Sequence, residues 1–229
     1  MSFLAEDSES FNFKENFMEH RTLSIADQIF EKIETDILVG NYEIGQILTE
    51  SGLSESLGVS RTPVREAIFR LEQEHLVMLI PKGIKVIGIS FEDIKIIFDM
   101  RIRIEGLGAR MAAINATEEQ IEKMKEFVDL QEFYHMKKDT ENMKSMDSNF
   151  HKILYEMTNS MHLYQTLYEL HKKTLKYRGV SITRESRASL SVKEHREIYE
   201  AIAKRDADLA EKLTIKHIEN ARYNILNIK

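Results

Sequence analysis

Hydrophobic positions in the first part of the chain recur with helical spacing and are separated by short polar or glycine-containing breaks. Isoleucines stand every four residues from Ile25 to Ile37, which predicts a helix over 23–38 that ends near Gly40. A second, short helix is expected over 50–57, and a third begins about three residues after it. Two helices joined by so tight a glycine turn are typical of a helix-turn-helix motif.

The third helix, in the segment VSRTPVREAIFRLEQEHL (59–76), has an apolar face and a separate cationic end. Ser60 can cap it, and Pro63 suits its first turn, where a missing N–H costs nothing. A helix end of this kind can present cations and N–H groups to phosphates and base edges. The apolar face carries Val64, Ala67, Ile68, Leu71 and Leu76, and the side chains that point elsewhere are Arg61, Thr62, Arg65 and Arg70.

The next segment, LVMLIPKGIKVIGI (76–89), changes to aliphatic and β-branched residues around Pro81, Lys82 and Gly83. This pattern predicts a two-stranded hairpin with Lys82 and Gly83 at its tip. Three helices followed by a hairpin make a winged helix-turn-helix, which we expect over residues 21–89. Generic packing of a short helix pair and a hairpin is the alternative that the pattern alone leaves open.

From Ser90 onward the pattern is helical, with no further strand signal. Residues 90–229 are therefore expected to form a second, all-α domain, and the whole chain falls in the mainly α class. Residues 1–20 are rich in acidic side chains without a sustained period, which indicates a mobile N-terminal arm. The six amphipathic helices expected in the second domain cover residues 91–114, 117–137, 140–158, 161–178, 188–204 and 207–227.

Composition and charge limit the classes of partner. The 229 residues carry a net charge of −6 and include no basic tail, so binding to nucleic acid has to come from a few well-placed arginines and lysines. The absence of cysteine excludes disulfides and thiolate metal sites, and it fits a reducing cytoplasm. Neither an apolar run of membrane-spanning length nor a signal peptide is visible, so we expect a cytoplasmic protein with no membrane partner.

The segment LTESGLSESLGVSRTPVREAIFRLEQEHLVMLIPKGIKV (48–86) resembles the DNA-binding domain of the GntR family of bacterial transcription regulators. The helical remainder resembles the FCD effector domain of the FadR-like branch of that family. A bundle of six helices favours its VanR-type subgroup. The segments that carry this second resemblance are FDMRIRIEGLGARMAA (98–113), DSNFH (147–151), KEHREIYEAI (193–202) and IKHIENA (215–221).

The resemblance implies where DNA would be contacted. Arg61, Thr62 and Arg65 stand where the family meets operator DNA, and Lys82 and Gly83 stand where its wing enters the minor groove. An arginine fork can bond O6 and N7 of guanine together, and a threonine can meet a phosphate or a thymine methyl group. Because one recognition helix reads few base pairs, we expect a homodimer on a short pseudo-palindrome.

Two positions differ from the family pattern. His75 stands where glycine often ends the recognition helix, and histidine tolerates a left-handed conformation better than most residues. Ser51 stands where some relatives carry an arginine, so one contact to DNA is expected to be missing.

Four side chains of the second domain are candidate metal ligands. Asp147 and His151 are four residues apart and stack on one side of a helix, whereas His195 and His217 fall on the apolar stripes of two later helices. Three imidazoles and a carboxylate suit a divalent metal, zinc above all, with nickel, manganese or iron as alternatives. Any one of these histidines could instead be a hydrogen-bonded core residue. The FCD resemblance places metal ligands at the four positions and leaves open whether His171 joins them.

Arg101 is in phase with Ile94 and Phe98, on a stripe that should be buried. A metal with open positions and an inward arginine could together clamp a small carboxylate effector. The FCD domain is similar in using an arginine of its first helix in this way. The alternative is a structural salt bridge from Arg101 to Glu105 or Asp147.

These features favour a ligand-responsive, dimeric transcription repressor that binds operator DNA and senses a small carboxylate through a metal-containing bundle. A metal-dependent, hydrolase-like enzyme is the rival, since an open His₃Asp site could activate water. That enzyme would need a positioned base and would leave the arginine-rich helix unexplained. A metal-storage protein is a third interpretation, although one mononuclear site stores little.

Overall fold

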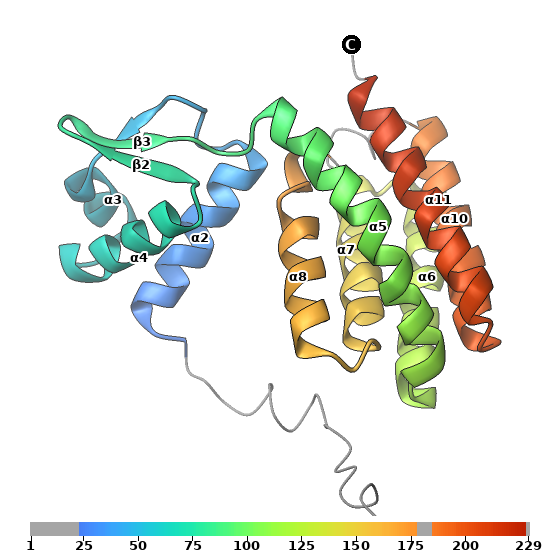
Figure 1. Cartoon of the computed structure of the whole chain (residues 1–229). Helices are drawn as coiled ribbons and strands as arrows, with labels where there is room; N and C mark the ends of the chain where they lie inside the picture. Colours follow the sequence, from blue (N-terminus) through green and yellow to red (C-terminus); the bar gives the residue numbers. More distant parts are fainter. Residues whose placement is uncertain (1–22, 178–184, 228–229) are drawn as a thin grey trace, which may run out of the picture.

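The computed structural model describes residues 23–177 and 185–227, which form an N-terminal domain of helices with a small sheet and a C-terminal bundle of long helices (Figure 1). The mainly α fold class is thus confirmed. The arm expected at residues 1–20 lies outside the described residues. Within the described part of the chain, no helix is both long and apolar enough to cross a membrane.

Helix α2 (Ile25–Val39) follows the predicted isoleucine pattern and has well-defined ends. Its N-terminus is a capping box, in which the Ser24 hydroxyl accepts from the N–H of Asp27 while the Asp27 carboxylate accepts from the N–H of Ser24. Gly40 ends the helix in a left-handed conformation with φ 90°. The predicted boundaries are therefore correct to within two residues.

Helices α3 (Glu50–Leu57) and α4 (Arg61–Gln73) form the predicted helix-turn-helix. Gly58 adopts φ 67° and turns the chain between them, which a residue with a side chain would do less easily. His75 takes the left-handed conformation with φ 57° just after α4, as its position predicted. The turn after α4 leads directly into the hairpin.

The hairpin consists of β2 (Val77–Ile80) and β3 (Gly83–Val86), paired antiparallel as predicted. A third strand, β1 (Ile47–Leu48), pairs with the other side of β3, so the sheet order is β1-β3-β2. The sequence did not predict β1, because two residues are too short to show an alternating pattern. Gly83 has φ 136°, and a Cβ at this position would collide with the carbonyl oxygen of Leu48, so only glycine fits.

A compact apolar core holds α2, α3, α4 and the sheet together. It includes all five apolar-face residues predicted for the third helix, and each of them is buried. The residues of this core are Ile29, Phe30, Ile33, Ile37, Leu38, Leu48, Leu53, Val64, Ala67, Ile68, Leu71, Leu76, Val77, Ile84 and Val86. Arg61, Thr62 and Arg65 lie outside it, as predicted.

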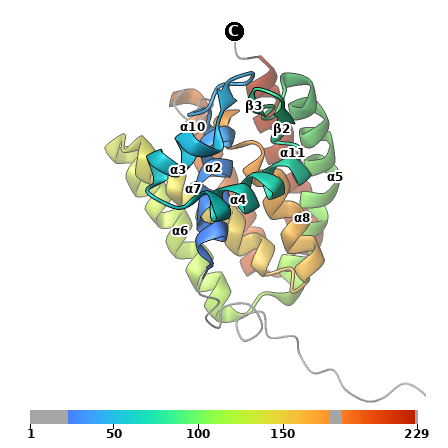
Figure 2. The same ribbon diagram turned by 90° about the vertical axis from the view of Figure 1, so that its left-hand side faces the viewer.

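Six long helices make up the described part of the second domain (Figures 1 and 2). They agree with the predicted segments except that the helix expected over 161–178 breaks after Lys172. The Thr174 hydroxyl donates to the carbonyl of His171 at 2.7 Å and turns the chain there. The helices are α5 (Phe91–Asn115), α6 (Glu118–Lys137), α7 (Thr140–Glu156), α8 (Met161–Lys172), α10 (Glu185–Ala203) and α11 (Ala207–Leu226).

Helix α5 lies between α8 and α11, and two glycines let these neighbours approach its backbone (Figure 1). A Cβ on Gly106 would lie 2.7 Å from Cγ1 of Ile215 in α11. A Cβ on Gly108 would lie 2.8 Å from Cδ1 of Leu167 in α8. Side chains of two flanking helices thus occupy the space that larger residues of α5 would need.

The C-terminal end of α8 lies against the N-terminal domain. Nζ of Lys172 is 2.8 Å from Oε2 of Glu34, a buried residue of α2, and 3.1 Å from Oε1 of Glu169. Nζ of Lys173 is 4.0 Å from Oε2 of Glu74, at the end of α4. Ion pairs from one helix end therefore reach both α2 and the end of α4.

Candidate metal centre and nucleic-acid interface

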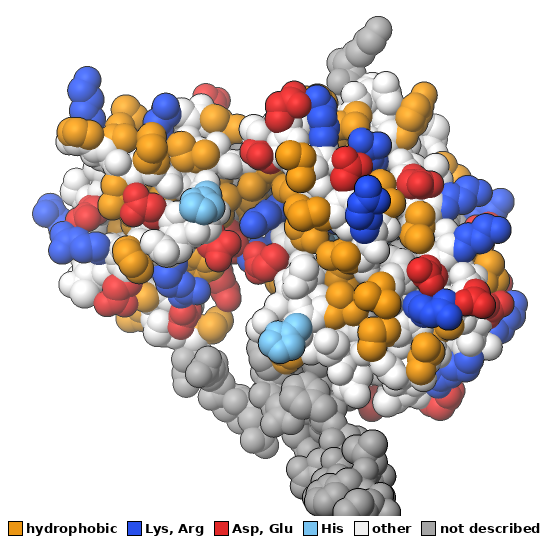
Figure 3. Space-filling model, viewed as in Figure 1, with side chains coloured by type: hydrophobic (Ala, Val, Ile, Leu, Met, Phe, Trp, Pro, Cys, Tyr) orange, Lys and Arg blue, Asp and Glu red, His pale blue; other side chains and the backbone are white. Residues whose placement is uncertain are grey.

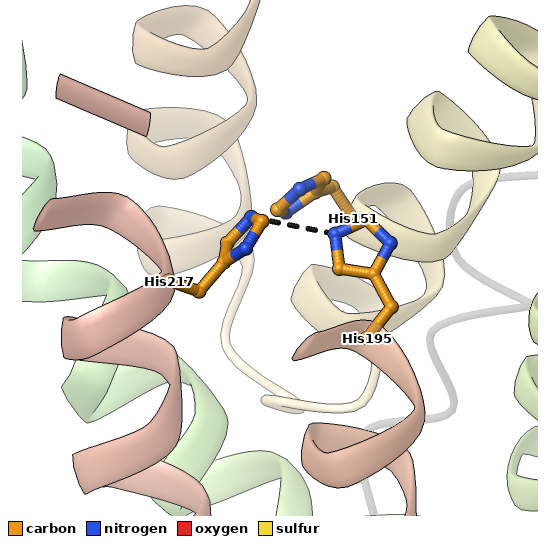
Figure 4. Close-up of side chains that lie close together, drawn as sticks. All are labelled: His151, His195 and His217. Atoms are coloured by element: carbon orange, nitrogen blue, oxygen red, sulfur yellow. Dashed lines mark hydrogen bonds between the residues drawn. The ribbon is translucent and has the colours of Figure 1, made fainter. Parts of the chain in front are cut away.

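Three histidines from three helices converge inside the helical domain. His151 lies on α7, His195 on α10 and His217 on α11, and all three are buried, as their apolar stripes predict. One ring nitrogen of each lies within 4.8 Å of those of the other two. Figure 4 shows the three rings directed toward one another. We refer to His151, His195 and His217 as the histidine cluster.

Glu194 orients the ring of His217. Its Oε2 accepts from Nδ1 of His217 at 2.7 Å, and its carboxylate also accepts from Arg187 at 2.8 Å and from Asn220 at 2.6 Å. Burial alone would raise the pKa of Glu194, but the hydrogen bond from His217 and the charge of Arg187 outweigh burial and lower it. Because an ionised carboxylate only accepts, Nδ1 of His217 carries the proton and Nε2 keeps a lone pair in the neutral ring.

The Nε2 atoms of His195 and His217 face each other at 3.3 Å, along the dashed line in Figure 4. Oε1 of Gln131 lies 2.8 Å from Nδ1 of His195, and as an acceptor it leaves the Nε2 lone pair of His195 directed at His217. Two facing lone pairs repel each other unless a cation lies between them. Two nitrogens bound to one tetrahedral zinc ion are about 3.4 Å apart, so the observed spacing fits a shared metal ion.

His151 adds a buried nitrogen with an incomplete environment. Among the described residues, Nδ1 of His151 has no hydrogen-bond partner, and the same holds for Oε2 of Glu105, 3.9 Å away. Burial lowers the pKa of His151 well below its ordinary value, and the neighbouring histidines and Arg101 act in the same direction. Since buried polar atoms normally find partners, a bound ion would complete this environment. Neutral imidazole is also the form that binds divalent metals.

Asp147 and His171 lie beside the histidine cluster. Oδ1 of Asp147 is 3.8 Å from Nε2 of His195, and Asp147 lies one helical turn before His151 on α7. The ring of His171 is 4.7 Å from that of His151, and its Nδ1 is 3.3 Å from the hydroxyl of Tyr155. The structure thus brings all four sequence-predicted ligands into one buried region, with Asp147 outside the tight group of three.

Arg101 lies at the edge of the same region and is only 1% exposed. Its Nε donates to Oε1 of Glu105, and its Nη1 donates to the hydroxyl of Thr174 at 3.1 Å. The pair with Glu105 is the structural salt bridge that the sequence left as an alternative. A guanidinium that binds one carboxylate can also bind the carboxylate of a ligand, by exchange or by its remaining donors.

The sequence did not identify Gln131 and Glu194, the two acceptors that orient the cluster. Glu194 directly precedes His195, and Gln131 continues the apolar stripe of α6 from Met124 and Val128. The sequence pattern that could have identified such an acceptor is a polar residue on an otherwise apolar helical stripe. Its partner could not be known before the helices were packed.

The start of α4 presents the residues that the family resemblance assigned to DNA. Arg61 and Thr62 are exposed. Arg65 donates from Nε and Nη2 to the two carboxylate oxygens of Glu50, at 3.1 Å and 2.8 Å, which ties α4 to the start of α3. Phe69, one turn further along α4, is 59% exposed and extends this face, although it is not among the residues predicted from the sequence to contact DNA.

The tip of the hairpin carries an exposed cation. Lys82 lies in the turn between β2 and β3, and Gly83 opens β3 at the position where a Cβ cannot fit. The tip therefore offers one ammonium group beside bare backbone, which suits a narrow groove lined by phosphates.

Comparison with known protein families gives two matches that together cover most of the chain. The family described as "Bacterial regulatory proteins, gntR family" matches residues 25–86. The family described as "FCD domain" matches residues 96–220, which include every residue of the histidine cluster.

Individual relatives and solved structures agree with these matches. The HTH-type transcriptional repressor RspR of Escherichia coli is 27% identical over 209 residues, 91% of this chain and 92% of that protein. The uncharacterized HTH-type transcriptional regulator YdhC of Bacillus subtilis is 26% identical over 196 residues, 84% of this chain and 87% of that protein. The structure of E. coli McbR/YncC is similar in fold, with a TM-score of 0.77 and 19% identity over 90% of this chain and 98% of that chain.

Proposed function

Because the chain belongs to the GntR family of bacterial transcription regulators and carries an FCD domain, we propose that it is a dimeric repressor whose DNA affinity responds to a small carboxylate. The observation that carries the proposal is the combination of a winged helix-turn-helix with exposed Arg61, Thr62 and Arg65 and a buried histidine cluster in one chain. Such a regulator would act in the cytoplasm, where the bacterial chromosome lies.

On DNA, α4 would enter the major groove and the hairpin the adjacent minor groove. Arg61, Thr62 and Arg65 would meet base edges and phosphates, and Lys82 and Gly83 would follow the phosphate backbone. The ion pair between Arg65 and Glu50 holds the guanidinium in place before DNA arrives. Two copies would bind half-sites about one helical turn apart or somewhat closer, because a single helix reads too few base pairs.

A divalent metal, zinc before nickel, manganese or iron, would be held by His151, His195 and His217, with Asp147 as a fourth ligand. The hydrogen bonds of Glu194 and Gln131 support this assignment, because they direct the free nitrogens of His217 and His195 inward. Bound there, the metal would supply a Lewis-acid position for one carboxylate oxygen. Arg101 would bind a second oxygen of the same ligand.

The contacts of α8 support a route from the ligand to the DNA-binding domain. Arg101 holds Thr174 just beyond α8, and Lys172 at the end of α8 holds Glu34 of α2. A ligand that draws Arg101 away from Glu105 or Thr174 would therefore shift the C-terminal end of α8, and with it the contact between Lys172 and α2. Helix α5 provides a second connection, because it begins at Phe91, only five residues after β3 ends at Val86.

We assign the protein to regulation and not to the hydrolase-like alternative. The relatives whose names state a function are transcription regulators. In addition, Glu105, the carboxylate next to His151, already pairs with Arg101 and is poorly placed to act as a free base.

A DNA-shift experiment tests the proposal. A fragment selected by the pure protein from a random pool would be titrated with metal-loaded and chelator-treated protein, each with and without a panel of small carboxylates. We expect specific binding to a two-fold sequence and a change in affinity with at least one carboxylate only when metal is present. Selection of no specific sequence would contradict the DNA-binding function, and an equal response after metal removal would contradict the metal-dependent sensor.

A further inference from the structure

Phe69 is the most exposed phenylalanine among the described residues, with 59% of its surface open to solvent. It belongs to α4, and the two residues before it, Ala67 and Ile68, are buried in the core of the N-terminal domain. Single hydrophobic residues are common on protein surfaces, so exposure alone indicates nothing. What distinguishes Phe69 is its place on the helix.

Phe69 shares one face of α4 with two residues that the family resemblance assigned to DNA. At about 100° per residue, Thr62, Arg65 and Phe69 fall within about 60° of one another around the helix. The same steps of three and then four residues separate base-reading residues on the recognition helix of homeodomains, which are a variant of the helix-turn-helix. Together with Glu66 and Arg70 the three residues line one shallow hollow, in which Phe69 is the largest apolar side chain.

Arg70, the next residue along α4, is drawn away from this face. Its Nη1 donates to Oδ1 of Asp27 near the start of α2, and its guanidinium lies 4.0 Å from the centre of the Phe30 ring. The cation at this level of α4 is therefore held against α2. Phe69 is the side chain that extends from the exposed face there.

We propose that Phe69 reads a thymine of the operator, by packing its ring against the 5-methyl group in the major groove. The inference rests on the proposed contact of α4 with DNA, and it adds one residue and the base that this residue recognises. Thymine carries a methyl group on its major-groove edge, and apolar side chains, phenylalanine among them, contact it there. Water leaves both the ring and the methyl group on contact, which favours the complex.

The surroundings of Phe69 favour DNA over a protein partner. A protein that covered Phe69 would also cover Thr62 and Arg65 on the same side of α4, and it would compete with DNA for them. Figure 3 shows Lys and Arg side chains at the left-hand end of the N-terminal domain, where α4 begins in Figure 1. Charges of this sign attract the phosphates on both sides of the groove, so they direct this face toward DNA.

The distance along α4 predicts which base pair is read. From Arg65 to Phe69 the helix rises about 6 Å, which is close to two base-pair steps of about 3.4 Å if the helix follows the groove. We therefore expect the thymine about two base pairs from the base pair that Arg65 contacts, once in each half-site.

Replacement of thymine by deoxyuridine tests the contact, because it removes the methyl group and leaves base pairing unchanged. Each thymine of the operator selected by the pure protein would be replaced in turn, and the affinity of the metal-loaded full chain would be measured by fluorescence anisotropy. We expect the replacement at the predicted position to weaken wild-type binding about fourfold for each half-site, the factor that corresponds to one buried methyl group.

Phe69→Ala should weaken binding to the unmodified operator and should no longer respond to deoxyuridine at that position. The two changes together should cost no more than Phe69→Ala alone, because they remove the same contact. Thr62→Ala is the matched control on the same face. Since a threonine can also meet a thymine methyl group, its variant should keep the response at the base assigned to Phe69. Phe133→Ala, at a 45% exposed position of α6, should bind every fragment as the wild type does.

The outcomes separate this contact from the function of α4. If no deoxyuridine replacement weakens wild-type binding, or if Phe69→Ala responds to every replacement as the wild type does, the inference is wrong. An equal loss of affinity for operator and for unrelated DNA in Phe69→Ala would also overturn it, because a lost base contact affects the operator alone. In each of these cases a weakened Arg65→Ala protein would still support α4 as the reading helix. An unweakened Arg65→Ala protein would remove the proposed DNA contact itself.

Discussion

Nδ1 of His217 lies 2.7 Å from Oε2 of Glu194, and this contact decides which nitrogen of the histidine is free. The carboxylate can only accept, so the proton is on Nδ1 and the lone pair of Nε2 faces His195. Arg187 and Asn220 hold Glu194 from its other side. The orientation of His217 is thus set by residues that would not touch a metal themselves.

Metal affinity should therefore depend on Glu194. Glu194→Gln replaces the ionised acceptor by a neutral amide, and we expect it to weaken metal binding by about 10–100-fold while the fold is kept.

His195→Ala should abolish stoichiometric metal and the effector response while leaving basal DNA binding. Competition with a chromophoric chelator measures both. His162→Ala, on the exposed side of α8, should bind metal as the wild type does; stoichiometric metal in His195→Ala would refute the site.

Arg101 should be needed both for stability and for the effector. Arg101→Ala leaves the buried carboxylate of Glu105 without its cation, which we expect to lower the free energy of unfolding by about 3–5 kcal/mol. Chemical denaturation measures this loss, and Arg101→Met/Glu105→Met should recover most of it because both charges are removed. Both variants should retain metal and lose the response to carboxylates. An unchanged response in the stable double variant would exclude Arg101 from effector binding.

Arg65→Ala should weaken binding to the selected operator by roughly 1–3 kcal/mol and relax its preference at one base pair. Fluorescence anisotropy on the operator and on single-base variants gives both quantities. Glu50→Gln is the variant to compare with Arg65→Ala, because it removes the carboxylate that holds Arg65 and leaves the guanidinium in place. If Arg65→Ala binds operator as well as the wild type does, α4 is not the reading helix.

Lys82→Ala should behave differently, because a wing lysine meets phosphate and not a base edge. We expect weaker binding to operator and to unrelated DNA by a similar factor, and a salt dependence reduced by about one phosphate contact. Anisotropy titrations at several salt concentrations check this. A loss confined to the operator sequence would mean that the wing reads bases.

Lys172→Met should uncouple the domains. It removes the cation that joins the end of α8 to Glu34 of α2, so the effect of a carboxylate on DNA affinity should shrink from a typical 1–3 kcal/mol toward zero. Metal content and DNA affinity without ligand should change little. Lys144→Met, whose lysine pairs with Glu141 one turn away on α7, is the control. If a carboxylate still changes the DNA affinity of Lys172→Met as much as that of the wild type, the coupling between the domains must run through α5.

Much of the fold could be predicted because its helices are long and their apolar stripes are regular. The isoleucine spacing in α2 and the glycine after α3 placed the helix-turn-helix. Strand β1 was missed because its pairing with β3 is set by chain geometry, and two residues carry no pattern. The break after Lys172 depends on the Thr174 hydroxyl and on Arg101, which lies far away in the sequence.

The candidate metal ligands could be predicted from the sequence, whereas the residues that orient them by hydrogen bonds could not. The histidines stand on apolar stripes, where a polar side chain is conspicuous. Gln131 and Glu194 support them from other positions, and only packing shows which acceptor meets which ring. For Arg101 the sequence offered two roles, and the structure contains the pair with Glu105 while the effector role stays a prediction.

The two glycines of α5 limit how the domain can move. Ile215 and Leu167 fill the space beside Gly106 and Gly108, so α5 cannot rotate about its own axis without a clash on one side. Its remaining freedom is to move together with α8 and α11 as a single body. The N–H groups of Ile87 and Gly88 donate to the carbonyl oxygen of Leu76 and tie this part of the connection to the N-terminal domain. A hinge between the domains would therefore lie between Gly88 and the start of α5, and switching would be a motion of whole domains on the microsecond-to-millisecond timescale.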